Sequence, residues 1–130
     1  MIGMARILVI DDCDVIRNLL HDFFTERGFD VDVAPTAPQG EEMANAGEYD
    51  AVICDTHLAG HSGTELVARL SQRKPSLPII MTNSMAQNSS KHAESAGALA
   101  CLHKPFELDQ MGELVQSVLQ KNIQHERNNS

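Results

Sequence analysis

Four short segments of the chain are apolar at every position, and each stops abruptly at a charged or hydroxyl residue. They cover residues 7–10, 51–54, 79–81 and 99–102. A strand without polar positions is buried on both faces, which is typical of a parallel sheet covered by helices on both sides. Residues 30–33 instead alternate polar and apolar side chains and predict an edge strand. The sequence therefore predicts an α/β fold with a doubly wound, five-stranded parallel sheet.

Chemically active side chains follow the four apolar segments. Asp11 and Asp12 follow the first, Asp55 the second and Thr82 the third, while Lys104 comes just after the fourth. The carboxyl ends of parallel strands form the crevice in which ligands bind, so we expect these side chains to converge. Three carboxylates, one hydroxyl and one ammonium group suit a divalent cation and a phosphoryl group.

Capping signals predict helices between the strands. Thr36 with Gln39 and Ser62 with Glu65 have the spacing of a capping box. Asp14 is the predicted N-cap of a first helix, and residues 85–96 read as a weak helix. Side chains predicted to be buried are Ile16, Leu19, Leu20 and Phe23 on the first helix and Leu108, Met111, Leu114, Val115 and Val118 on the last.

Composition narrows the class of protein. The 130 residues predict one domain over residues 1–123, with a polar, disordered tail over residues 124–130. A net charge of −8, with ten scattered basic residues, argues against direct nucleic-acid binding. No segment is apolar enough to span a membrane, and three widely separated cysteines indicate free thiols in a reducing compartment. We therefore expect a cytoplasmic protein.

Taken in order and at these intervals, the polar residues resemble the receiver domain of bacterial response regulators. The resemblance covers about residues 5–119 and implies a flavodoxin-like fold with strand order 2-1-3-4-5. The matching residues are Asp11-Asp12, Asp55, Gly63, Thr82, Gly97-Ala98 and Lys104-Pro105-Phe106.

The resemblance implies a Mg²⁺ site, in which Mn²⁺ is a substitute. Asp12 and Asp55 would be direct ligands, Asp11 would act through water, and the backbone carbonyl of His57 would supply another oxygen. Hard oxygen ligands of this kind are those that Mg²⁺ prefers. His57 and His61 have the spacing of a helical zinc pair, but they lie in a glycine-containing loop, which argues against a zinc site.

The same resemblance makes Asp55 a phosphoacceptor, which takes a phosphoryl group from a phosphohistidine. Lys104 would neutralise charge and Thr82 would donate a hydrogen bond to a phosphoryl oxygen. The segment from Pro78 to Thr82 looks one residue short, so Asn83 competes for the role of Thr82, although spacing back from Lys104 favours Thr82.

We therefore predict a stand-alone receiver of a two-component phosphorelay. Its partners would be a sensor histidine kinase or histidine phosphotransfer protein and a downstream target protein. One alternative is a pseudo-receiver adaptor that works without phosphate. The other is a phosphohydrolase of the haloacid dehalogenase type, whose motif has a second acid two residues after the first, where this chain has His57.

One departure from the family pattern concerns the output. Cys101 stands where receivers usually carry an aromatic residue, three residues before the lysine. A thiol cannot sweep the volume of a moving ring, so we expect the response to phosphorylation to involve residues 83–96 instead.

Overall fold

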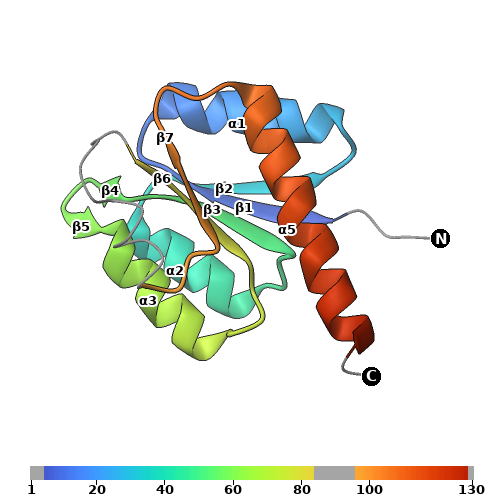
Figure 1. Cartoon of the computed structure of the whole chain (residues 1–130). Coiled ribbons are helices and arrows are strands. Elements are labelled where there is room, and N and C mark those ends of the chain that lie inside the picture. Colours follow the sequence, from blue (N-terminus) through green and yellow to red (C-terminus); the bar gives the residue numbers. More distant parts are fainter. Residues whose placement is uncertain (1–4, 84–95, 129–130) are drawn as a thin grey trace.

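A five-stranded parallel sheet forms the centre of the computed structural model, which describes residues 5–83 and 96–128 (Figure 1). Its strands are β1 (Arg6–Ile10), β2 (Asp30–Ala34), β3 (Ala51–Asp55), β6 (Ile79–Asn83) and β7 (Ala100–His103). Their order is β2-β1-β3-β6-β7, and all neighbouring pairs are parallel. The predicted flavodoxin-like order is therefore confirmed, with β2 at one edge and β7 at the other.

Helices cover both faces of this sheet (Figure 1). On one face lie α1 (Asp14–Glu26) and α5 (Leu108–Asn128); on the other lie α2 (Ala37–Ala46) and α3 (Gly63–Arg73). Successive strand residues face opposite sides, so Ile7 and Val9 pack with α1 and α5 while Leu8 and Ile10 pack with α2 and α3. This two-sided burial explains why the central strands β1, β3 and β6 are largely apolar. The prediction is wrong for the apolar segment 99–102, because β7 is an edge strand that is only half-buried and Leu99 is 58% exposed.

Most of the predicted helix starts are confirmed. The Thr36 hydroxyl accepts a hydrogen bond from the backbone N–H of Gln39, and the Ser62 hydroxyl accepts one from that of Glu65, both at 3.2 Å. The prediction for Asp14 is wrong, because Cys13 is the N-cap and Asp14 is the first helical residue. Its carboxylate pairs with the guanidinium group of Arg17, three residues further along the helix, instead of capping the helix.

Burial differs from the prediction most at Leu19, while Ile16 on the first helix and Leu108 and Leu114 on the last are half-buried. Leu20 and Phe23 are buried as predicted, and Phe24 is buried with them, but Leu19 is 46% exposed. Buried positions spaced three and four residues apart define one stripe on a helix, and Leu19 lies beside that stripe.

Several boundaries differ from those predicted. Strand β3 includes Asp55, which pairs with Thr82, and strand β6 includes Asn83, which pairs with His103 of β7. A two-stranded hairpin, β4 (His57–Leu58) with β5 (His61–Ser62), was not predicted. The backbone of α5 is helical through Asn128, and the domain boundary at residue 123 stays a prediction. The weak helix predicted at residues 85–96 lies outside the described residues except for its last position.

No helix in the described ranges is long and apolar enough to cross a membrane. No disulfide joins the three cysteines: Cys13 is exposed, Cys54 is buried, and Cys101 is half-buried on the edge strand β7.

Candidate functional site

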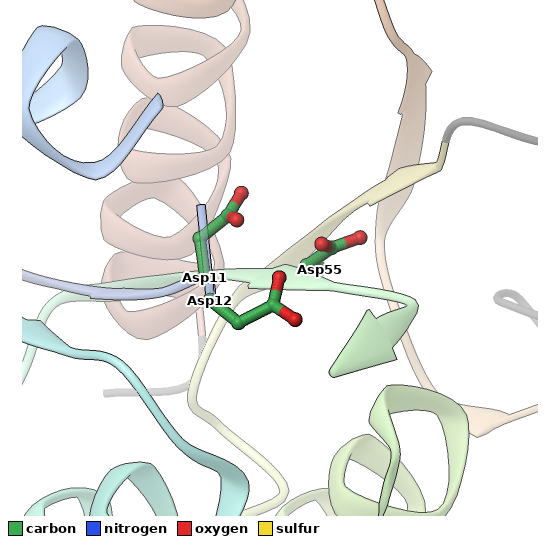
Figure 2. Close-up of side chains that lie close together, drawn as sticks. All are labelled: Asp11, Asp12 and Asp55. Carbon is green, nitrogen blue, oxygen red and sulfur yellow. The ribbon is translucent and has the colours of Figure 1, made fainter. Parts of the chain in front are cut away.

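Three carboxylates converge at the carboxyl ends of β1 and β3 (Figure 2). These strands are neighbours, and their register pairs Ile10 with Cys54, so Asp11 and Asp55 come next on adjacent strands. One oxygen atom from each of Asp11, Asp12 and Asp55 lies within 4.8 Å of the others. Asp11 and Asp55 are buried, at 2% and 5% exposure, whereas Asp12 is exposed. The structure therefore brings the three predicted acidic residues together.

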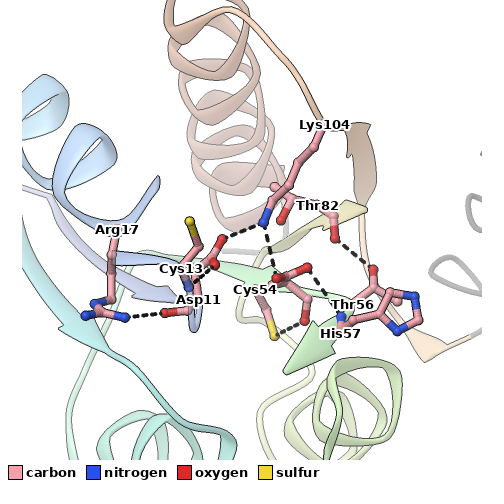
Figure 3. Close-up of polar contacts among 9 residues, drawn as sticks. Asp11, Cys13, Arg17, Cys54, Thr56, His57, Thr82 and Lys104 are labelled. Atoms are coloured by element: carbon pink, nitrogen blue, oxygen red, sulfur yellow. Dashed lines mark hydrogen bonds and ion pairs between the residues drawn. The ribbon is translucent and has the colours of Figure 1, made fainter. Parts of the chain in front are cut away.

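An ammonium group lies between the two buried carboxylates (Figure 3). The Nζ atom of Lys104 is 2.9 Å from Asp11 Oδ2 and 3.2 Å from Asp55 Oδ2. Strand β7 delivers this side chain, and the backbone N–H of Lys104 extends the ladder by donating to the carbonyl of Asn83 at 2.7 Å. The lysine side chain is only 16% exposed, so these ion pairs are largely shielded from water.

Burial and the neighbouring Asp11 carboxylate raise the pKa of Asp55, and these effects outweigh the opposing influence of Lys104 and the His57 N–H. Burial lowers the pKa of Lys104, but hydrogen bonding and attraction to Asp11 and Asp55 outweigh it and raise that pKa overall. Both directions follow from two buried carboxylates sharing one ammonium group. The site therefore holds an excess of negative charge that a cation would relieve.

Backbone groups orient the two buried carboxylates. Asp11 Oδ1 accepts a hydrogen bond from the N–H of Cys13 at 2.9 Å, and Asp55 Oδ1 accepts one from the N–H of His57 at 3.3 Å. Within the described ranges, no group hydrogen-bonds to the Asp12 carboxylate. Its position therefore depends on the backbone of the turn and on its own side-chain torsions.

The hydroxyl of Thr82 is buried beside this cluster. Thr82 pairs with Asp55 across β3 and β6, and side-chain alternation places the two on the same face of the sheet. Its Oγ1 atom has no hydrogen-bond partner in the part of the chain that the structure describes. Asn83, also buried, extends from the opposite face of β6. A buried hydroxyl without a partner is a donor still to be satisfied, which accords with the role predicted for Thr82.

The loop after Asp55 is shaped by Gly63. A Cβ atom on Gly63 would lie 1.9 Å from the Asp55 carbonyl oxygen, so only glycine lets α3 begin this close to the site. The N–H of Gly63 donates to the carbonyl of Thr56 at 2.8 Å and closes the loop. In the hairpin, His57 pairs with Ser62 and His61 with Leu58, which places the two imidazoles on opposite faces and rules out a shared ion. The His57 carbonyl stays a predicted metal ligand.

One residue at the site was missed by reasoning from the sequence. Arg17 of α1 reaches back over the turn, and its Nη1 atom donates to the backbone carbonyl of Asp11 at 2.8 Å. The available signal was its spacing three residues after Asp14, which brings the two side chains together on a helix.

The donor set fits a small, hard divalent cation. Clustered carboxylate oxygens are the ligands that Mg²⁺ prefers, and two or three of them leave coordination positions for water and substrate oxygens. A bound cation would also offset the repulsion that raises the pKa of Asp55. Asp11, Asp12 and Asp55 are the residues that would hold it.

Comparison with known proteins identifies relatives of the whole domain. The family model of the response regulator receiver domain matches residues 7–116. The chain is 34% identical over 108 residues to the transcriptional regulatory protein TcrA of Mycobacterium tuberculosis, covering 82% of this chain and 43% of TcrA. Against the DNA-binding transcriptional regulator NtrC of Rhizobium meliloti, the identity is 32%, covering 82% of this chain and 22% of NtrC. The chain thus spans less than half the length of these relatives.

Solved structures show the same fold. A CheY-like receiver domain protein from Methanospirillum hungatei has a TM-score of 0.91 at 25% identity, covering 95% of this chain and 99% of the other. The response regulator protein TrrA of Thermotoga maritima, determined in complex with Mg²⁺-BeF, has a TM-score of 0.81 at 31% identity, covering 88% of this chain and 99% of the other.

Proposed function

Because the chain belongs to the family of response regulator receiver domains, we propose that Asp55 is its phosphoryl acceptor. The observation that carries this proposal is that Asp55, of the three carboxylates, pairs in the sheet with Thr82, whose buried hydroxyl has no partner among the described residues. The Asp55 carboxylate also contacts the Lys104 ammonium group and lies within 4.8 Å of two further carboxylates. Asp11 shares the contact with Lys104, but it follows β1, which is not a neighbour of β6.

Transfer would proceed from a phosphohistidine to a carboxylate oxygen of Asp55. A new O–P bond forms as the P–N bond to the imidazole breaks, and the donor histidine leaves as neutral imidazole after taking up a proton. Such a transition state depends on in-line positioning and on neutralising the phosphoryl oxygens. A Mg²⁺ ion, when bound, supplies part of that positive charge.

Residues of the chain supply the remaining stabilisation. Lys104 already contacts Asp55 Oδ2, so its ammonium group is in place to stabilise the negative charge on the oxygens of the incoming phosphoryl group. The Thr82 hydroxyl, which has no partner in the described residues, would donate to a phosphoryl oxygen. The N–H of His57 holds Asp55 Oδ1 and leaves Oδ2 as the attacking atom once Lys104 shifts to the incoming group.

Receiver domains interact with histidine kinases and with downstream effectors. For this chain we propose a sensor histidine kinase or a histidine phosphotransfer protein as donor, and a downstream protein as target. Relatives such as NtrC are DNA-binding regulators over a greater length than this chain covers, so the expected lack of direct nucleic-acid binding stays a prediction.

The test is phosphorylation by a small phosphodonor in the presence of Mg²⁺. We expect one acid-stable, base-labile phosphoryl group per chain, as for an acyl phosphate, and none on Asp55→Asn. Asp109→Asn is the matched control, because Asp109 lies in the first turn of α5, outside the acidic cluster, and its side chain is 82% exposed. An Asp55→Asn protein that accepts phosphate at the wild-type rate contradicts the proposal. Sustained turnover of phosphate esters would favour the phosphohydrolase alternative.

A further inference from the structure

Asp12 is the least constrained member of the acidic cluster. Asp11 and Asp55 each accept a backbone N–H and share the Lys104 ammonium group, whereas the exposed Asp12 carboxylate has no hydrogen-bond partner among the described residues. A ligand held only by its backbone depends on whatever fixes that backbone. The relevant unit is the peptide group that joins Asp11 to Asp12.

The guanidinium group of Arg17 holds this peptide group. Its Nη1 atom donates to the Asp11 carbonyl oxygen, a contact drawn in Figure 3, over a distance of 2.8 Å. The arginine side chain is only 15% exposed. Because a peptide group is planar, fixing the carbonyl oxygen of Asp11 also fixes the direction of the N–Cα bond of Asp12. Rotation about φ and the side-chain torsions of Asp12 remains, so the Arg17 contact narrows the directions open to the Asp12 carboxylate.

A second side-chain contact holds the guanidinium group in place, because its Nη2 atom pairs with the carboxylate of Asp14. The bond of 3.0 Å from the Arg17 backbone N–H to the Cys13 carbonyl is an ordinary helical hydrogen bond, which substitutions of the side chain would leave intact. Asp14 is 80% exposed, so this ion pair contributes little free energy by itself and serves to orient the guanidinium plane. The partly buried bond to the Asp11 carbonyl is the contact that acts on the site.

We propose that Arg17 is a positioning residue that orients Asp12 for divalent-cation binding. This inference rests on the proposed function, since it concerns the cation that Asp11, Asp12 and Asp55 would hold. Residues that orient metal ligands typically change metal affinity by 10–100-fold when replaced, and we expect a weakening of about tenfold here.

Electrostatics alone predicts the opposite result, which makes the role testable. Removing a positive charge near three carboxylates should strengthen the binding of a cation. Loss of positioning should weaken it. Arg17→Met removes both the charge and the donors, whereas Arg17→Lys keeps the charge and loses the planar fork that spans the Asp11 carbonyl and Asp14. Positioning predicts weaker binding in both variants.

The experiment titrates Mg²⁺ into the full chain and follows both the dissociation constant and the thermal midpoint. Arg27→Lys is the matched control, because Arg27 lies at the other end of α1 and makes the same two kinds of contact, to the Phe23 carbonyl and the Asp109 carboxylate. We expect Mg²⁺ affinity to fall about tenfold in Arg17→Lys and Arg17→Met and to stay unchanged in Arg27→Lys. In phosphorylation assays, the Mg²⁺ concentration for half-maximal rate should rise by the same factor while the rate at saturation stays within about twofold.

Each outcome separates the two proposals. If the wild type binds Mg²⁺ and Arg17→Lys binds it equally well, or if Arg17→Met binds it more tightly, the role of Arg17 is overturned. A lower thermal midpoint with unchanged Mg²⁺ affinity would mean that Arg17 only stabilises the fold, which also overturns the role. A wild type whose midpoint and titration signal do not respond to millimolar Mg²⁺ would overturn the proposed function itself, and the inference with it.

Discussion

Lys104 and Asp55 lie 49 positions apart in the sequence, yet their charged atoms are only 3.2 Å apart at the carboxyl ends of the strands. Lys104 contacts Asp11 as well, at 2.9 Å, so one ammonium group serves two buried carboxylates. In the metal-free protein this lysine is the main source of positive charge in the cluster. It therefore contributes to the stability of the fold as well as to the proposed chemistry.

Replacing Lys104 should destabilise the metal-free protein more than the metal-loaded one. Lys104→Met leaves Asp11 and Asp55 buried without their ion-pair partner, at an expected cost of about 1–3 kcal/mol in the free energy of unfolding. Urea unfolding with EDTA and with Mg²⁺ measures the difference, which Mg²⁺ should reduce. Lys74→Met is the control, since Lys74 binds two carbonyls at the end of α2 and its loss should be independent of Mg²⁺. Equal destabilisation of Lys104→Met under both conditions contradicts the expectation.

The pH dependence of the free energy of unfolding should reveal the raised pKa of Asp55. Burial and the Asp11 charge raise its pKa in the folded protein above the ordinary value of 3.8, so the native state keeps this proton to a higher pH than the unfolded chain. The protonated Asp55 carboxyl group therefore contributes to the free energy of unfolding in full below about pH 3.8, and this contribution is lost as pH rises through the folded pKa. We expect the free energy of unfolding of Asp55→Asn to exceed that of the metal-free wild type by an amount that grows as pH rises through the folded pKa of Asp55. Urea unfolding in EDTA at a series of pH values is the measurement, and a difference that does not vary with pH would refute the prediction.

Gly63 should tolerate no side chain. In Gly63→Ala the new Cβ would collide with the Asp55 carbonyl oxygen, which is backbone and cannot turn away. We expect a loss of at least about 2 kcal/mol in stability, together with slower phosphorylation, because α3 must move away from the acceptor. Gly60→Ala is the control: Gly60 has a φ of +74° but nothing within 4 Å, so we expect only the conformational cost of about 1 kcal/mol. Equal effects of the two substitutions would show that the close approach is unimportant.

Tyr49 offers a check at the opposite end of the sheet. Burial, and then its hydrogen bond to Asp32 at 2.7 Å, raise the pKa of Tyr49 to about 12. Its contribution to stability is therefore fully present below the ordinary pKa of 10.0 and is lost as pH rises toward about 12. Because Tyr49 is the only tyrosine, phenolate absorbance follows it directly. We expect a midpoint near 12 that falls in Asp32→Asn, and a midpoint near 10 in the folded wild type would contradict the structure.

The sequence predicted the elements of the site because the signal is local. Strands buried on both faces are apolar throughout, so the first polar residue after each strand is visible, and parallel strands bring these ends together. Asp11, Asp12, Asp55 and Lys104 were identified in this way, and the structure places all four in one cluster. The roles of Thr82 and of the His57 carbonyl stay predictions.

Tertiary contacts decided what local patterns do not encode. Whether Asp14 caps α1 or pairs with Arg17 depends on where Arg17 finds its second acceptor, the Asp11 carbonyl, and that requires the folded turn. Strand β6 continues to Asn83 because β3 and β7 pair with it on both sides, although its last two residues are polar. The sequence by itself thus determined which side chains stand at the ends of buried strands, since burial alone demands apolar residues. Only the tertiary structure decided the partners of those side chains. The turns after β1 and β3 aim the N–H groups of Cys13 and His57 at the carboxylates. Lys104 meets the same carboxylates across 93 and 49 positions of sequence, because the sheet brings these segments together.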